Sequence, residues 1–223
     1  MNHAFALAAA IGAAFGPALA QPPAPREGWT VSVGVAPFFG PIYQGADDYG
    51  VAIYPDIRVA YGDRFFASVP EGMGYRLFTS EQFSAGPIAR INFGRDANSG
   101  SSPFLIVGDS DDLAGLNDIP VAGEFGAFAE FGGRTLSFRA EARRGVGAHE
   151  GFIGDVSARH ARRIGKSILS FGPEATFAGG DYVNRYFGVT AAESLASGLP
   201  AFSAGGGVVS YGAGATLVRS LGE

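Results

Sequence analysis

The stretch YGVAIYPDIRVAY, residues 49–61, decides the fold of this chain. Its odd-numbered positions are Tyr, Val, Ile, Pro, Ile, Val and Tyr, and its even-numbered positions include Gly50, Asp56 and Arg58. This strict period of two predicts a β-strand, and one longer than the usual soluble strand of about five or six residues. Tyrosines end the apolar face on both sides, which is typical of a transmembrane barrel strand with lipid on one face and a polar lumen on the other.

The same alternation recurs in residues 83–94, 135–143 and 167–177. Charged side chains such as Arg90 and Glu141 fall on the face opposite the apolar one. These charges are costly in lipid but can pair in a wet lumen. A soluble β-sandwich also alternates and is the alternative, but the strand length and the aromatic ends favour a barrel.

The connections between these segments differ in length, as they do in barrels with short periplasmic turns and long external loops. The short ones are 62–64, 79–82, 132–134 and 164–166, and the long ones are 38–48, 95–118, 146–151 and 179–199. This assignment requires residues 65–78 to form two short strands that turn at 70–72. The predicted strands are 29–37, 49–61, 65–69, 73–78, 83–94, 119–131, 135–144, 152–162, 167–177, 201–210 and 212–218.

The ends of the chain are predicted to lie outside the strands. Residues 1–20 carry no charge and end in Ala-Leu-Ala, which predicts a cleaved signal peptide rather than an uncleaved membrane anchor. Residues 21–28 form a proline-rich linker, and residues 29–223 form the barrel domain. The eleven predicted strands are odd in number, whereas bacterial barrels have even numbers, so about 12 strands are expected when the barrel is complete, with the last strand or strands beyond Glu223.

The composition fits this all-β, antiparallel prediction. The chain has 35 glycines, 19 phenylalanines, no cysteine and a net charge of −5, which excludes disulfide and thiolate-metal sites and disfavours nucleic acid as a partner. The rival interpretation of residues 201–218 as a membrane helix is disfavoured by its glycines, each of which costs about 1 kcal/mol in a helix. Tyr182, Tyr186 and Phe187 of the 179–199 loop are expected at the outer rim, in headgroups or folded over the mouth.

No catalytic, cofactor or metal residues are predicted, and the protein is predicted not to be an enzyme. His149 lies in a long loop without a serine motif, since Ser110 lacks the strand–turn–helix context that a nucleophile elbow needs. Asp109, Asp111 and Asp112 resemble part of a calcium loop, but Leu113 occupies a ligand position. His149 is therefore interpreted as a loop-ordering residue.

Two basic groups are candidate contact sites. Arg143 and Arg144 are expected at the outer rim, where guanidinium groups suit lipopolysaccharide phosphates. The second group surrounds a periplasmic turn, where it is predicted to meet an acidic partner protein or to form a solvated rim. It consists of Arg159, Arg162, Arg163 and Lys166.

The chain resembles the MltA-interacting protein (MipA)/OmpV family of Gram-negative outer-membrane proteins. The motifs that carry the resemblance are PIYQG (41–45), YPDIRVAYGDRFFAS (54–68), GMGYRL (72–77), FGR (93–95), GLNDI (115–119), EFGAFAEF (124–131), GAHEGF (147–152) and YFGVTAAESLASGLPAF (186–202). Two departures are a longer, more apolar 101–112 segment and the absence of a C-terminal strand that ends in an aromatic residue.

The resemblance implies location in the outer membrane and a role as a non-enzymatic scaffold. Such a scaffold brings together a murein lytic transglycosylase and a peptidoglycan synthase. Other members are described as porin-like or adhesive, so a pore and an adhesin are the alternatives. No catalytic residues come with this family.

Overall fold

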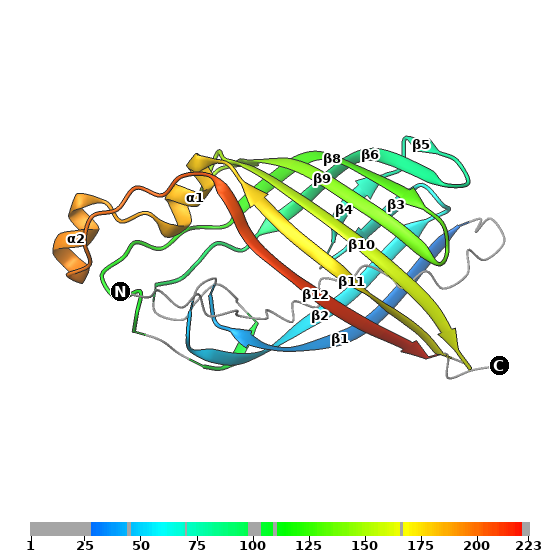
Figure 1. Ribbon diagram of the computed structural model, residues 1–223, viewed down its shortest axis with the longest axis horizontal. Helices are drawn as coiled ribbons and strands as arrows, with labels where there is room; N and C mark the ends of the chain where they lie inside the picture. The colour runs from blue at the N-terminus through cyan, green and yellow to red at the C-terminus, as the bar shows by residue number, and fades with distance from the viewer. Residues whose placement is uncertain are drawn as a thin grey trace.

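The computed structural model describes residues 28–43, 46–69, 71–97, 104–108, 111–165 and 167–219. In these residues, 12 strands form one antiparallel sheet, and two short helices lie at one end of it (Figure 1). The all-β, antiparallel prediction is confirmed. The predicted signal peptide, almost all of the linker and Lys166 lie outside the described residues. The elements are β1 (Trp29–Pro41), β2 (Tyr49–Tyr61), β3 (Phe65–Ser68), β4 (Gly72–Tyr75), β5 (Phe78–Thr79), β6 (Phe83–Asn92), β7 (Leu105–Val107), β8 (Ala122–Gly132), β9 (Leu136–Val146), β10 (Phe152–Ile164), β11 (Ser167–Ala178), α1 (Gly180–Phe187), α2 (Ala191–Ser197) and β12 (Gly207–Arg219).

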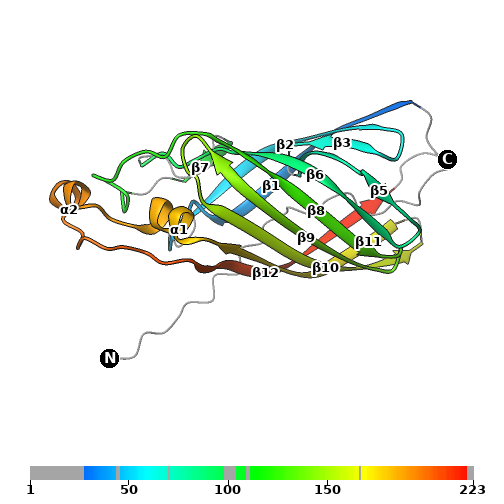
Figure 2. The same cartoon turned by 90° about the horizontal axis from the view of Figure 1, so that it is seen from above.

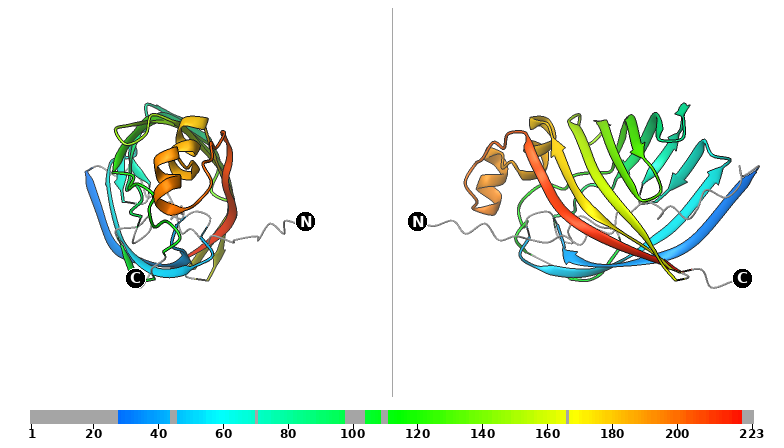
Figure 3. Two further views of the ribbon diagram at one scale, coloured as in Figure 1. Left: turned by 90° about the vertical axis from the view of Figure 1, so that its left-hand side faces the viewer. Right: turned by 45° about the vertical axis from the view of Figure 1, so that its right-hand side comes forward.

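The strands follow one another around the sheet in the order β1-β2-β3-β4-β6-β8-β9-β10-β11-β12, while β5 pairs with β6 and β7 pairs with β2. The strands are tilted and the sheet curls, so one face turns inward and the other outward (Figures 2 and 3). β1 and β12 are the two ends of the order, and among the described residues no strand pairing joins them.

The alternation of β2 places its apolar side chains on the outward face. Val51, Ile53 and Ile57 are exposed, whereas Ala52 between them is buried. β1 continues this face with Val31, Val33 and Val35, the last two exposed by 79% and 73%. The outward face of the sheet is therefore an apolar surface with no protein packed on it at these positions.

The two ends of the sheet differ, as the connection lengths predict. We call the end that carries α1 and α2 the helix end, and the opposite end the turn end (Figure 1). Connections at the turn end are short, such as the two residues between β10 and β11, whereas residues 93–121 and 179–206 connect strands at the helix end. The predicted split of residues 65–78 is confirmed, since β3 and β4 pair as a short antiparallel hairpin.

Several predicted boundaries were wrong. The two strands predicted at 201–210 and 212–218 are one strand, β12, which pairs with β11 through a single register shift near Thr176. The segment predicted as the strand 73–78 divides into β4 and β5, and β8 begins at Ala122 rather than at residue 119. Two of the four long connections are also more ordered than expected, because 95–118 contains β7 and 179–199 contains both helices.

Glycines inside the strands allow neighbouring backbones to come close. A Cβ atom on Gly126 of β8 would lie 1.9 Å from the carbonyl oxygen of Ala142, and one on Gly172 of β11 would lie 1.9 Å from that of Ala158. Glycine inside a strand often marks such a close approach or a tight bend. Neither α1 nor α2 is long or apolar enough to cross a membrane, and the described residues contain no other helix.

Candidate functional site

An ion cluster centred on Arg143 lies on the inward face near the helix end. β8, β9 and β10 are adjacent and bring Glu124, Arg143 and Asp155 together. Arg143 Nε lies 3.0 Å from Glu124 Oε2, and Nη2 lies 2.6 Å from Asp155 Oδ2. Its Nη1 also donates to Glu141. The Arg143 side chain is only 4% exposed, so three carboxylates surround a buried cation.

The same network extends across the inward face through Glu141. Its Oε1 accepts from Arg90 Nη2 at 2.9 Å and from Arg139 Nε at 2.8 Å. The Arg139 guanidinium in turn lies 4.7 Å from the centre of the Phe128 ring. These contacts connect β6, β8 and β9 on the inward face of the sheet. Removing one partner from a buried network of this kind is destabilising, because it leaves an uncompensated charge.

Two tyrosines and a histidine lie above this cluster. Tyr182 and Tyr186 are four residues apart on α1, and their rings stack with centroids 4.4 Å apart. The His149 ring meets Tyr182 edge-on at 5.0 Å, and its Nε2 lies 3.5 Å from Glu124 Oε1. The His149 side chain is completely buried. Its position assigns His149 a packing role between α1 and the ion cluster, in agreement with a loop-ordering residue.

α1 is held in place by polar contacts at its C-terminal end. Tyr186 donates from its hydroxyl to Asn92 Oδ1 at 2.8 Å, and Arg95 donates to the backbone carbonyl of Tyr186. Burial raises the pKa of Tyr182 to about 12 and raises that of Tyr186 as well. Burial also lowers the pKa of Arg95. Both phenols therefore stay neutral at physiological pH.

The apolar side of α1 packs onto the helix end of the sheet. Its tyrosines form a core cluster with Ile119, Ile153 of β10 and Ala178 of β11. In the end-on view, α1 lies within the outline of the curled sheet (Figure 3). Of the two expected positions for the tyrosines, the one folded over the mouth is therefore the observed one.

α2 is fixed by a capping box and by a contact with the other long loop. Thr190 accepts at its hydroxyl from the backbone N–H of Glu193, and Glu193 accepts from the backbone N–H of Thr190. Gly198 ends the helix in the left-handed conformation, with φ of 76°. Asn117 donates to Glu193 Oε1 from its backbone and its side chain, both at 3.0 Å. Residues 111–119 and α2 therefore form one unit.

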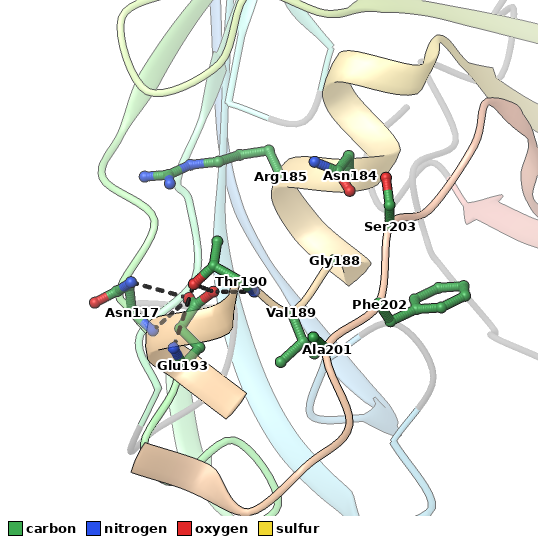
Figure 4. A pocket seen from close by; sticks show the side chains of 10 residues that line it. All are labelled: Asn117, Asn184, Arg185, Gly188, Val189, Thr190, Glu193, Ala201, Phe202 and Ser203. Atoms are coloured by element: carbon green, nitrogen blue, oxygen red, sulfur yellow. Dashed lines mark hydrogen bonds between the residues drawn. The ribbon is translucent and has the colours of Figure 1, made fainter. Parts of the chain in front are cut away.

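A cleft of about 470 Å³ opens between α1, α2 and the segment that follows them (Figure 4). An isolated bridge pairs Val189 with Phe202, which both line the cleft, and the side chain of Asn184 accepts from the backbone of Ala204. Its lining combines polar side chains with three apolar ones. The lining residues are Asn117, Asn184, Arg185, Gly188, Val189, Thr190, Glu193, Ala201, Phe202 and Ser203.

The structure separates the predicted basic residues. Arg143 was predicted at an exposed rim, but its side chain points inward and is buried by three carboxylates, so that prediction was wrong in its location. Arg144 is exposed on the outward face of β9, with its guanidinium 5.5 Å from the Phe152 ring. Arg159 is partly buried on the inward face of β10. Arg162 and Arg163 are exposed at the turn end.

The sequence did not predict that three particular carboxylates lie close together. The carboxylates of Asp47, Asp48 and Asp112 come within 4.8 Å of one another at the helix end, and Tyr43 donates to Asp112 at 3.0 Å. All three are exposed, and exposed acidic groups are common without an ion. The sequence prediction grouped Asp112 with its chain neighbours, because Asp47 and Asp48 belong to a different connection, between β1 and β2.

The cleft was also missed, although part of its signal is in the sequence. Thr190-Ala-Ala-Glu193 is the pattern of a capping box, which predicts a helix start. Gly198, eight residues after Thr190, fits a helix end. The contacts of Asn117 with α2 have no such local signature.

No curated protein and no solved structure matches the chain. A family model described as MltA-interacting protein MipA matches residues 33–223, which include every strand from β2 to β12 and most of β1. By this match over most of its length, the chain belongs to the MltA-interacting protein MipA family.

Proposed function

We propose that this protein is an outer-membrane β-barrel that acts as a non-enzymatic scaffold for peptidoglycan-remodelling enzymes. Membership of the MipA family is the observation that carries the proposal, because the family is described by its interaction with MltA, a lytic transglycosylase. A peptidoglycan synthase is the second proposed client. The outward and inward faces of the sheet support the membrane location.

The outward face has the dimensions of a lipid-facing band. On β10, the outward positions run from Phe152, which pairs with Arg144, to Arg162 near the turn end. Ten residues at about 3.3 Å each, tilted by about 40°, give a height of about 25 Å, which is the height of the apolar band in barrels. Val156 lies between Phe152 and Arg162 and is exposed.

Aromatic pairs lie at both ends of this band, as barrels place them at the two membrane interfaces. At the turn end, the Trp29 and Tyr61 rings lie 5.0 Å apart. At the helix end, Phe39 and Tyr49 of the same two strands lie 5.5 Å apart. Both pairs are exposed. The proposal places the turn end in the periplasm, since it has the short connections.

The turn end is the proposed docking side for the transglycosylase, with Arg162 and Arg163 as contacts. Both are exposed beside the two-residue connection between β10 and β11. Lys166 and Arg159 were predicted in the same group, and Arg159 lies further inside on the inward face. At the helix end, Arg144 remains the proposed contact for lipopolysaccharide.

Capture of the purified transglycosylase by the barrel in detergent tests this proposal. The wild-type protein is expected to retain the enzyme, and the double variant Arg162→Glu, Arg163→Glu is expected to lose at least about tenfold in affinity, because reversed charges face the same partner surface. The matched control is Arg144→Glu, which changes an exposed arginine at the other end. Retention by the double variant removes the arginine contacts, and no retention by the wild type overturns the scaffold.

The positions of α1 and of the Arg143 cluster favour a scaffold over the pore alternative. α1 packs its tyrosines against Ile153 and Ala178 at the helix end, above the buried Arg143 cluster. Both features occupy space that a permeating solute needs. Planar-bilayer recordings of the wild-type protein are therefore expected to show no reproducible conductance steps, and regular steps would favour the pore.

A further inference from the structure

The backbone pairing of the sheet has a gap between β2 and β6, in the half nearer the helix end. In the turn-end half, β3 pairs with the last four residues of β2, and β4 pairs with the middle of β6. Nearer the helix end, β7 pairs with the other end of β2 (Figure 2). Among the described residues, no strand pairs with 54–56 of β2 or with 90–92 of β6 on the edges that face each other.

The sequence of β2 is adapted to this gap. Ile53 donates from its backbone to the carbonyl of Phe104 at 3.1 Å. The carbonyl of Ile57 accepts from the backbone of Val69 at 3.2 Å. Because backbone groups alternate between the two edges of a strand, Pro55 midway between them presents its backbone to the same edge. Proline has no N–H to leave unpaired and is found in sheets at such unpaired edges, so the gap is a built feature of the strand.

Side-chain contacts, rather than backbone hydrogen bonds, join the two sides of the gap. The ring of Phe104 lies 5.2 Å from that of Tyr54 in β2 and 5.5 Å from that of Phe93, which directly follows β6. A side chain changes its rotamer much faster than a strand leaves its ladder. Phe104 is therefore a movable barrier between the two strands.

The outward rim of the gap is apolar and continues the lipid-facing surface proposed above. Charged side chains beside the gap are paired, Arg58 with Glu71 at 2.6 Å and Arg90 with Glu141 at 2.9 Å. An apolar chain needs no hydrogen-bond partner, so it suits a rim of this kind better than a polar ligand does. The exposed rim residues come from β2, β4, β6 and β7 and are Ile57, Met73, Ile91 and Val107.

We propose that this gap admits the acyl chain of a membrane lipid from the outward face to the inward face of the sheet. Phe104 moves aside when the chain enters, and Tyr54 contacts the chain on the inward side. The inference rests on the proposed membrane location, because it needs lipid on the outward face. It adds a lipid-binding site that the scaffold role does not require.

Photolabelling of the protein in phosphatidylcholine vesicles tests the gap. The probe is a phosphatidylcholine that carries a diazirine on one acyl chain, and mass spectrometry identifies the labelled residues. Val156 is exposed on the outward face and reports contact with lipid, whereas Tyr54 lies at an inward position of β2 and reports entry. Label is expected on both. Label on Val156 alone overturns the gap but keeps the membrane location, and label on neither overturns both.

A pair of phenylalanine variants tests the barrier. Phe104→Ala is expected to raise the label on Tyr54 at least about threefold, because removing the ring leaves unfilled space. Phe66→Ala is the matched control, since Phe66 packs against Phe128 in the turn-end half of the sheet, and it should leave the label on Tyr54 unchanged. An equal rise in both variants, or none in Phe104→Ala, counts against the barrier.

A second pair tests the apolar rim. Ile91 of β6 and Val146 of β9 are both exposed and pair with Gly123 of β8 from its two sides, so they lie at the same height on the sheet. Ile91→Asp is expected to lose most of the label on Tyr54, because a carboxylate at the rim disfavours an acyl chain beside it. Val146→Asp should keep that label, and equal label in the two variants contradicts entry at this rim. The heat-dependent gel mobility of each variant shows that it retains the fold.

Discussion

Arg143 shows how a single charge can connect three strands of a sheet. Its guanidinium pairs with Glu124 of β8, Glu141 of its own strand and Asp155 of β10. The side chains of these three carboxylates are at most 29% exposed, and the positive charge of Arg143 is shared among them. Its main contribution is therefore to offset the free-energy cost of burying these negative charges inside the sheet.

We expect Arg143→Met to lower the free energy of unfolding by about 3–5 kcal/mol, because removing one partner leaves buried charges uncompensated. Urea unfolding in lipid vesicles, followed by the fluorescence of the single tryptophan, Trp29, measures this change. The control Arg144→Met removes an exposed arginine from the next position and should change the value by less than about 0.5 kcal/mol. Similar values for both variants would contradict a special role for Arg143.

Glu193 provides a pH-dependent prediction. Its pKa is lowered from 4.5 to about 2, so the contribution of its contacts to stability is complete above about pH 4.5 and is lost as the pH falls towards 2. We expect the amide signals of Asn117 and Thr190 to remain unchanged from pH 7 to 4.5 and to shift below that. Glu193→Gln should show shifted signals at all of these pH values, and a wild-type midpoint near 4.5 would contradict the assignment.

Among the elements, the strands depend on glycine where two backbones come close. Gly126→Ala would place a methyl group 1.9 Å from the carbonyl oxygen of Ala142, so we expect β8 and β9 to lose their register. Gly133→Ala is the matched control, because nothing lies within 4 Å of its Cβ position. The heat-dependent shift in gel mobility of the folded barrel measures the outcome, and equal folding of both variants would contradict the crowding.

The sequence predicted strands better than it predicted helices and boundaries. Period-two alternation identified β2 and β6, because the polarity of each side chain indicates which face of the sheet it occupies. The same rule failed for β12. Small residues on both of its faces hide the alternation, so the sequence predicted two strands that meet at Tyr211 instead of one. The two helices are short, and only α2 has end signals in the sequence, the capping box at Thr190 and the glycine at Gly198.

The candidate site was less predictable because its contacts join distant parts of the chain. Arg143 was predicted at the outer rim beside Arg144, because its burial depends on carboxylates of the neighbouring strands β8 and β10. The contact between Asn117 and Glu193 spans 76 positions. Pairing of this kind is set by how loops pack at the helix end, which local patterns do not record.

At the scale of the whole molecule, the proposed lipid contact has a direct test. We expect Val156→Arg, which puts a charge in the middle of the outward face, to lower the free energy of unfolding in vesicles by about 2–4 kcal/mol. Leu195→Arg changes a side chain of α2 that is 90% exposed and lies outside the strands, and it should have little effect. An equally small effect for Val156→Arg would mean that water, not lipid, covers this face.

Residues 111–119 and α2 form one unit, so their substitutions are coupled. Gly115 lies against Ala196, where an added Cβ would be 2.8 Å from its backbone, and Asn117 bonds to Glu193. A substitution that displaces one of these two segments therefore also displaces the other. Changes at this end of the sheet are expected to be tolerated as matched pairs, one in each segment, rather than singly.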